Sequence, residues 1–156
     1  MFKNLREKCN HLIKLGRYNR PTGAFLLMWP CFWGALSNLS IEVKLFKYLI
    51  LFFVGAFVMR GVGCCINDFF DMKIDRLVKR TKNRPLANGK VSINEAFIFV
   101  IVQLIFGLII LLQFDFEVII LGFFIFPFII VYPLLKRFTY FPQFLLGFVF
   151  NWGILI

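Results

Sequence analysis

Three aspartates in the middle of the chain have a spacing that suits metal chemistry. Asp68, Asp71 and Asp75 are separated by three and then four residues. On an α-helix of 3.6 residues per turn these side chains fall on one face, and Asn67 adds an amide oxygen beside them. Like charges in this arrangement repel each other by about 0.2–0.5 kcal/mol per pair, and a bound divalent cation would remove that cost. The spacing therefore predicts a cation site.

Oxygen ligands of this kind suit Mg²⁺, which commonly binds one or two protein carboxylates together with substrate phosphates. The same stretch is rich in cations that can hold phosphate oxygens directly. These cations are Lys73, Arg76, Lys79, Arg80, Lys82 and Arg84. Carboxylates and cations together indicate a diphosphate site. The alternative is a charged loop whose acids pair with its bases, and charge alone does not separate the two.

The rest of the sequence places this stretch at a membrane boundary. The chain has 156 residues, of which 60% are hydrophobic, and the apolar residues come in long blocks separated by short charged segments. A single soluble core of this size does not absorb such a surplus, so the blocks are predicted to be membrane spans. Ionisable residues at the end of a span are functional candidates by default. This position favours a binding site over a loop of ion pairs.

The predicted organisation is a basic surface segment, 1–20, followed by an all-α integral membrane domain, 21–156. Membrane spans are expected at about 22–39, 46–66, 96–114, 118–135 and 142–156. The aspartates follow the second span directly. The last apolar block has about fifteen residues, which are too few to cross a membrane comfortably. Four complete spans and a truncated fifth are therefore expected.

The net charge of +10 does not indicate nucleic-acid binding, because the basic residues lie between the apolar blocks. Six precede Pro21, and seven lie between Lys73 and Lys90. Together with Lys136 and Arg137 they fall on one side if each block crosses once, and the positive-inside rule makes that side cytoplasmic. The four cysteines and the single histidine have no metal-binding spacing, so the cysteines are expected to be small buried apolar residues.

Three segments of the sequence resemble one enzyme family. Residues 67–75 look like the first aspartate motif of the UbiA superfamily, NDxxDxxxD. Residues 20–34, RPTGAFLLMWPCFWG, look like the first-helix signature of its 4-hydroxybenzoate polyprenyltransferase branch. Residues 132–153, YPLLKRFTYFPQFLLGFVFNWG, are similar to the segment between the fourth and fifth helices of that branch. The resemblance covers most of the chain in the right order.

The resemblance implies a UbiA-type transmembrane helix bundle that transfers a polyprenyl group from polyprenyl diphosphate to the ring of 4-hydroxybenzoate, a step towards ubiquinone. It implies that Asp68, Asp71 and Asp75 are catalytic and bind Mg²⁺, and that Asn67 helps to hold the diphosphate. The basic residues with an expected substrate-binding role are Arg20, Lys79, Arg80, Arg84, Lys136 and Arg137. The implied surroundings are the lipid of a bacterial inner membrane or a mitochondrial inner membrane, the bacterial one being favoured.

Alternatives to this interpretation stay open. The family has a second aspartate motif later in its sequence, and this sequence stops before it, so a truncated, catalytically inactive fragment is the main rival. Other members of the superfamily share the aspartate motif, including haem O synthase, chlorophyll synthase and an enzyme of the menaquinone pathway. A channel or transporter is disfavoured, because its charges would lie along a pathway within a span.

Overall fold

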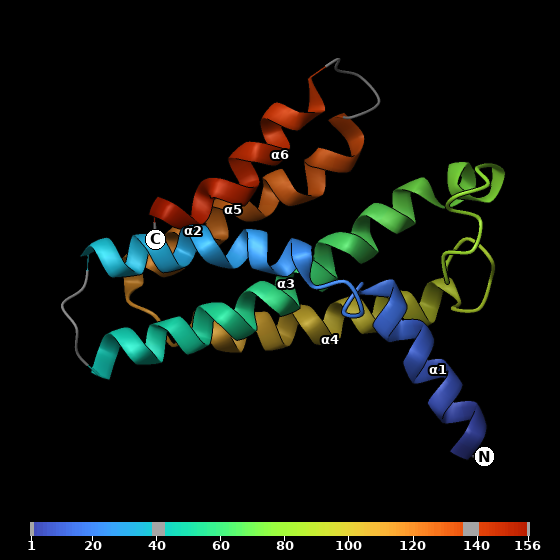
Figure 1. The fold of residues 1–156 in the computed structure, drawn as a ribbon, viewed down its shortest axis with the longest axis horizontal. Coiled ribbons are helices and arrows are strands. Elements are labelled where there is room, and N and C mark those ends of the chain that lie inside the picture. Colours follow the sequence, from blue (N-terminus) through green and yellow to red (C-terminus); the bar gives the residue numbers. More distant parts are fainter. Residues whose placement is uncertain (1, 39–42, 136–140, 156) are drawn as a thin grey trace.

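Six α-helices and one short 3₁₀ helix form the computed structural model, which describes residues 2–38, 43–135 and 141–155 (Figure 1). The elements are α1 (Phe2–Leu15), α2 (Thr22–Asn38), α3 (Val43–Leu77), α4 (Ile93–Leu111), α5 (Phe116–Leu135), α6 (Pro142–Asn151) and η1 (Trp152–Leu155). The prediction of an all-α fold is confirmed. Because α3, α4 and α5 are long and apolar enough to cross a membrane, the protein is a multi-pass membrane protein. The shorter apolar stretches, 22–37 and 143–155, stay predicted spans.

Helix α3 is longer than the span that the sequence predicted at 46–66. It contains 35 residues and continues without a break to Leu77. At 1.5 Å per residue its length is about 52 Å, which exceeds the hydrocarbon thickness of a bilayer, about 30 Å. The polar last turns of α3 therefore extend beyond the apolar layer and carry Asn67 and the three aspartates on a regular helix.

The core is built where α2 and α4 pack against α3, while α5 pairs with α6 (Figure 1). One cluster of buried side chains joins α3 and α4 to the end of α1 and to the segment between α3 and α4, and comprises Leu15, Val62, Cys65, Leu86, Val91, Ala96 and Val100. A second cluster, towards the other end of α3, comprises Ala35, Leu45, Tyr48, Phe52, Ile110, Phe114 and Val118. Large side chains such as Ile105, Phe106 and Phe123 are exposed on the helix surfaces, as expected for contact with lipid.

The charged end of the bundle is formed by α1, the last turns of α3 and the segment 78–92 (Figure 1). Ser92 caps α4 in a capping box with Glu95, and Lys8 of α1 forms an ion pair with the same glutamate. Helix α1 is thereby joined to the start of α4 as well as to α3.

The cysteines follow the sequence prediction in part. All four are free thiols, and Cys64 and Cys65 are buried in α3. Cys31 is half-buried in α2. Cys9 is exposed on α1, so the prediction that every cysteine is buried is wrong for this one, because it lies on the polar face of the helix.

Candidate functional site

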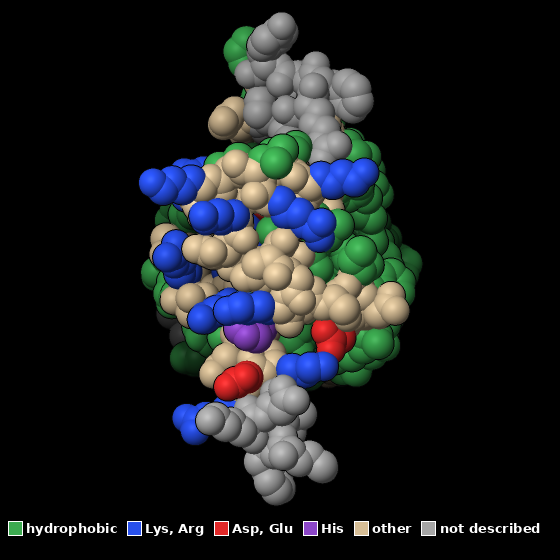
Figure 2. All heavy atoms as spheres, turned by 90° about the vertical axis from the view of Figure 1, so that its right-hand side faces the viewer, with side chains coloured by type: hydrophobic (Ala, Val, Ile, Leu, Met, Phe, Trp, Pro, Cys, Tyr) green, Lys and Arg blue, Asp and Glu red, His purple; other side chains and the backbone are tan. Residues whose placement is uncertain are grey.

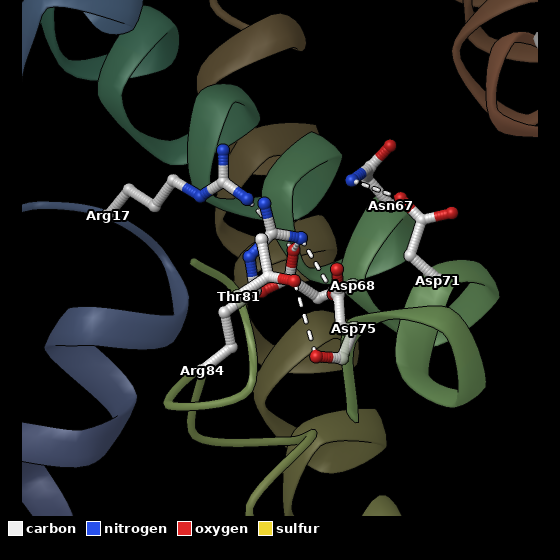
Figure 3. Close-up of polar contacts among 7 residues, drawn as sticks. All are labelled: Arg17, Asn67, Asp68, Asp71, Asp75, Thr81 and Arg84. Atoms are coloured by element: carbon white, nitrogen blue, oxygen red, sulfur yellow. Dashed lines mark hydrogen bonds and ion pairs between the residues drawn. The ribbon is translucent and has the colours of Figure 1, made fainter. Parts of the chain in front are cut away.

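Two of the three aspartates share one guanidinium group at the charged end. Asp68 and Asp75 are separated by seven residues, so they lie within about 20° of each other around the helix axis. Arg84 Nη1 lies 3.0 Å from Asp68 Oδ1 and 2.7 Å from Asp75 Oδ2 (Figure 3). Both carboxylates are buried, with 2% of Asp68 and 5% of Asp75 exposed. The guanidinium group of Arg84 is thus the cation that both carboxylates share on this side of α3.

A second arginine reaches Asp68 from the turn between α1 and α2. Arg17 Nη2 lies 2.9 Å from Asp68 Oδ1, the same oxygen that accepts from Arg84. Arg17 has a φ of 57°, a left-handed conformation that a residue with a side chain seldom adopts and that costs on the order of 1 kcal/mol. The surrounding turn and the ion pair hold the backbone in this conformation.

The segment 78–92 is attached to the end of α3 by further polar contacts. The Thr81 hydroxyl donates to the carbonyl oxygen of Asp75 at 3.2 Å, and Arg76 Nε donates to the carbonyl oxygen of Ala87 at 3.0 Å. Leu86 and Val91 of the same segment are buried in the first core cluster. The segment therefore folds back over the helix end rather than extending into solvent.

Asp71 has a different partner from the other two aspartates, and its side chain points away from theirs (Figure 3). Its Oδ2 accepts from Asn67 Nδ2 at 3.1 Å, and both side chains point away from Arg17 and Arg84 (Figure 3). Three residues correspond to about 300° of helix rotation, so Asp71 lies about 60° from Asp68. The three aspartates thus lie within one broad face of the helix, but their side chains form a buried pair and a half-buried third.

This division decides which residues fit a metal ion. Within the described ranges, no three His, Cys, Asp or Glu side chains gather as a metal-binding group. Asp68 and Asp75 already form ion pairs with guanidinium groups, which a divalent cation at the same oxygens would have to compete with. Asn67 and Asp71 are adjacent at the end of the apolar part of α3, and they carry the amide and carboxylate oxygens that Mg²⁺ prefers. This second pair fits the ion.

Three of the remaining predicted binding residues are basic and lie at the surface. Lys79 and Arg80 are exposed on the segment 78–92, and Arg20 is exposed just before α2. Figure 2 shows Lys and Arg side chains spread over the end of the molecule that contains α1 and this segment. Lys136 and Arg137 lie outside the residues that the structure describes. The structure thus brings Arg84, but not Lys79 or Arg80, into contact with the aspartates in the described part of the chain.

Arg60 is a candidate that sequence reasoning missed. It lies in α3 seven residues before Asn67, and its guanidinium carbon lies 5.6 Å from the centre of the Phe150 ring. The guanidinium also packs against Gly23 of α2, where any side chain would clash with it. An arginine this far into an apolar helix is a functional candidate by default. The signal in the sequence was the single charge in the second apolar block.

A polar junction lies between the helices at Gly61, the residue after Arg60. The Tyr18 hydroxyl donates to Gln103 Oε1 of α4, and both groups contact the α3 backbone at Gly61. Burial, and the nearby Cys65 and Cys64, raise the pKa of Tyr18 to about 12. The phenol therefore stays protonated and keeps donating its hydrogen bond throughout the physiological range.

The fold and the charged end define a class: an all-α multi-pass membrane protein with a carboxylate and guanidinium cluster where one long helix leaves the apolar layer. The model of the UbiA prenyltransferase family matches residues 27–156, and the chain belongs to this family of enzymes.

Curated relatives agree with this assignment. The mitochondrial 4-hydroxybenzoate polyprenyltransferase of Drosophila pseudoobscura pseudoobscura is 46% identical over 92% of this chain and 36% of its own length. The 4-hydroxybenzoate octaprenyltransferase of Shewanella loihica is 44% identical over 97% of this chain and 52% of its own. The chain thus spans about a third to half of the length of these relatives. Because both mitochondrial and bacterial proteins match, the expected preference for a bacterial membrane is not supported.

A solved structure supports the same fold. A protein described as digeranylgeranylglyceryl phosphate synthase in membranes superposes with a TM-score of 0.74 and 26% identity. The match covers 95% of this chain and 51% of that one. The UbiA-type helix bundle predicted from the sequence is therefore confirmed.

Proposed function

We propose that the chain supplies the first aspartate motif of a membrane enzyme that transfers a polyprenyl group from polyprenyl diphosphate to the ring of 4-hydroxybenzoate. The names of the relatives, at 44–46% identity, support this acceptor over the one acted on by the solved synthase, at 26%. The observation that carries the proposal is the Asn67–Asp71 pair at the end of the apolar part of α3, next to a segment rich in cations.

In this proposal the diphosphate is held at the charged end. Asn67 and Asp71 would hold Mg²⁺, and Lys79 and Arg80 would contribute cations to the phosphate oxygens. When bound, Mg²⁺ supplies positive charge that stabilises the diphosphate as it leaves. The isoprenoid tail extends along the apolar part of α3. This arrangement suits a substrate with a charged head and a lipid tail.

The protein's own residues also suit the reaction that follows. The allylic C–O bond breaks with its electron pair going to the diphosphate, and the resulting allylic cation must be kept from water. The apolar helices exclude water along the path of the tail. The ring carbon beside the phenol oxygen attacks the cation and then loses its proton. We propose that Arg60 orients the acceptor. Its guanidinium group lies over the Phe150 ring and could pair with the carboxylate of an aromatic acid.

The test is a chimaera in which residues 1–156 replace the matching half of the Shewanella loihica octaprenyltransferase. Membranes containing the chimaera are assayed for transfer of labelled octaprenyl from its diphosphate to 4-hydroxybenzoate, with and without EDTA. We expect transfer that stops when Mg²⁺ is removed and returns when it is added back. A chimaera that inserts into the membrane at the parent's level but transfers nothing would contradict the proposal and favour the inactive-fragment alternative. Transfer to another aromatic acceptor only would place the chain in a different branch.

A further inference from the structure

Four charged side chains at the end of α3 form a continuous set of ion pairs, which we call the clamp: Arg17, Asp68, Arg84 and Asp75. We propose that Asp68 and Asp75 are positioning residues and not metal ligands. They hold the two arginines, and through them the 78–92 segment and the turn at Arg17, against the side of α3 next to Asn67 and Asp71 (Figure 3). The role of the clamp in positioning a metal site rests on the proposed function, whereas the existence of the clamp rests on geometry alone.

The charges of the clamp balance without a metal ion. Two buried carboxylates face two guanidinium groups, and all three N–O distances are between 2.7 and 3.0 Å. A divalent cation at Asp68 Oδ1 or Asp75 Oδ2 would lie beside guanidinium groups of the same sign and would compete with them for these oxygens. Displacement would leave an arginine without its carboxylate in a partly buried position, which is unfavourable. The buried aspartates are therefore occupied by the arginines.

The contacts of Arg84 join parts of the chain that the helix alone does not hold together. Asp75 is in the last turns of α3, and Arg84 lies nine residues later, inside the returning segment. Between them the Thr81 hydroxyl donates to the Asp75 carbonyl oxygen, so the segment contacts the same helix end twice. Arg17 adds the turn before α2, 51 residues from Asp68 in the sequence. The clamp thus fixes two loops at one place on α3.

Local hydrogen bonds make the position of the segment measurable. The amides of Thr81, Lys82, Arg84, Asn88 and Val91 each donate to a carbonyl oxygen within the segment. If the ion pairs hold the segment closed, these amides exchange slowly with solvent deuterium, and loss of one clamp residue speeds their exchange. Metal affinity at Asn67 and Asp71 is measured separately, with Mn²⁺ as an EPR-visible substitute for Mg²⁺.

The experiment uses the whole chain in lipid nanodiscs, with Asp75→Asn, Arg84→Gln and Asp71→Asn compared to the parent. For Asp75→Asn and Arg84→Gln we expect the rate of amide exchange in 78–92 to rise about tenfold or more. Whatever change in Mn²⁺ affinity one of these two variants shows, we expect the other to show the same change. For Asp71→Asn we expect unchanged exchange in that segment and a loss of Mn²⁺ affinity of about tenfold or more. Unchanged exchange in α4 shows that a variant is folded. If Asp75→Asn fails this check, Asp75→Glu is used, with protection expected to lie between that of Arg84→Gln and the parent.

Two results would overturn the inference. One is unchanged exchange in 78–92 for both Asp75→Asn and Arg84→Gln. The other is a loss of Mn²⁺ affinity in Asp75→Asn that Arg84→Gln does not reproduce, because the carboxylate itself would then be a ligand. Failure of the proposed function looks different: the parent chain binds no Mn²⁺, or Asp71→Asn binds it as the parent does, and amide exchange alone then decides whether the clamp exists.

Discussion

Arg84 and Asp75 form an ion pair, with 2.7 Å between Nη1 and Oδ2, that closes the segment following α3 back onto the helix. The same Nη1 reaches Asp68 at 3.0 Å, so one side chain serves two buried carboxylates. Since each carboxylate would be costly to bury alone, the arginine and the aspartates depend on each other. This relationship makes the charged end a folded unit rather than a solvated loop.

Replacement of Arg84 by Met is expected to destabilise the protein. Removing one partner of a buried ion pair costs about 3–5 kcal/mol, and the partial exposure of Arg84 lowers our expectation to about 2 kcal/mol. The measurement is the free energy of unfolding in detergent micelles. Lys90→Met is the matched control, because Lys90 is exposed on the same segment. Equal stability of the two variants would show that the Arg84 contacts contribute nothing.

Gly61→Ala is expected to break the junction between Tyr18 and Gln103. A methyl group at this position would clash with the Gln103 side-chain oxygen and the Tyr18 hydroxyl, whereas at Gly63 it would meet nothing within 4 Å. We expect Gly61→Ala to lower the free energy of unfolding by about 1–3 kcal/mol. Gly63→Ala, the control, should be neutral or stabilising by up to about 1 kcal/mol, because alanine favours a helix. The hypothesis fails if both changes have the same effect.

The ionisation of Tyr18 gives a pH prediction. Its pKa is raised to about 12 in the folded protein, above the usual value of about 10. The sign follows from linkage: this contribution to stability is complete below about pH 10 and is lost as the pH rises towards 12. Alkaline titration of tyrosinate absorbance in the parent and in Tyr18→Phe isolates this group. A Tyr18 that ionises near pH 10 would mean that its hydroxyl is in contact with solvent.

The sequence allowed the long helices and the helical aspartate motif to be predicted, because both depend on local pattern. Apolar blocks long enough to span a bilayer require helices, and this held for α3, α4 and α5. The end of the second block was harder to predict. Polar residues after Ile66 indicated the end of a membrane span. The end of a span is not the end of a helix, because a helix can continue with polar side chains once it has left the apolar layer, and α3 continues to Leu77.

The partners of the aspartates could not be predicted from spacing. Residues three and four positions apart share a broad face, but only the seven-residue pair, Asp68 and Asp75, falls almost in line. Which cation meets them depends on how the chain returns after α3 and on the turn at Arg17, and both are set by tertiary packing. For the same reason the single charge of Arg60 was visible in the sequence, while its contact with Phe150 was not.

The most direct test of the central claim is the effect of Asp71→Asn on prenyl transfer in the chimaera, measured over a range of Mg²⁺ concentrations. Asp115→Asn is the control, because that aspartate lies in the loop before α5, outside the charged end, where it pairs with Lys44 of α3. We predict that Asp71→Asn lowers the rate by about a hundredfold at a fixed Mg²⁺ concentration, and that Asp115→Asn stays within about twofold of the unsubstituted chimaera. An Asp71→Asn chimaera that transfers at the unsubstituted rate, with the same Mg²⁺ dependence, would contradict the account.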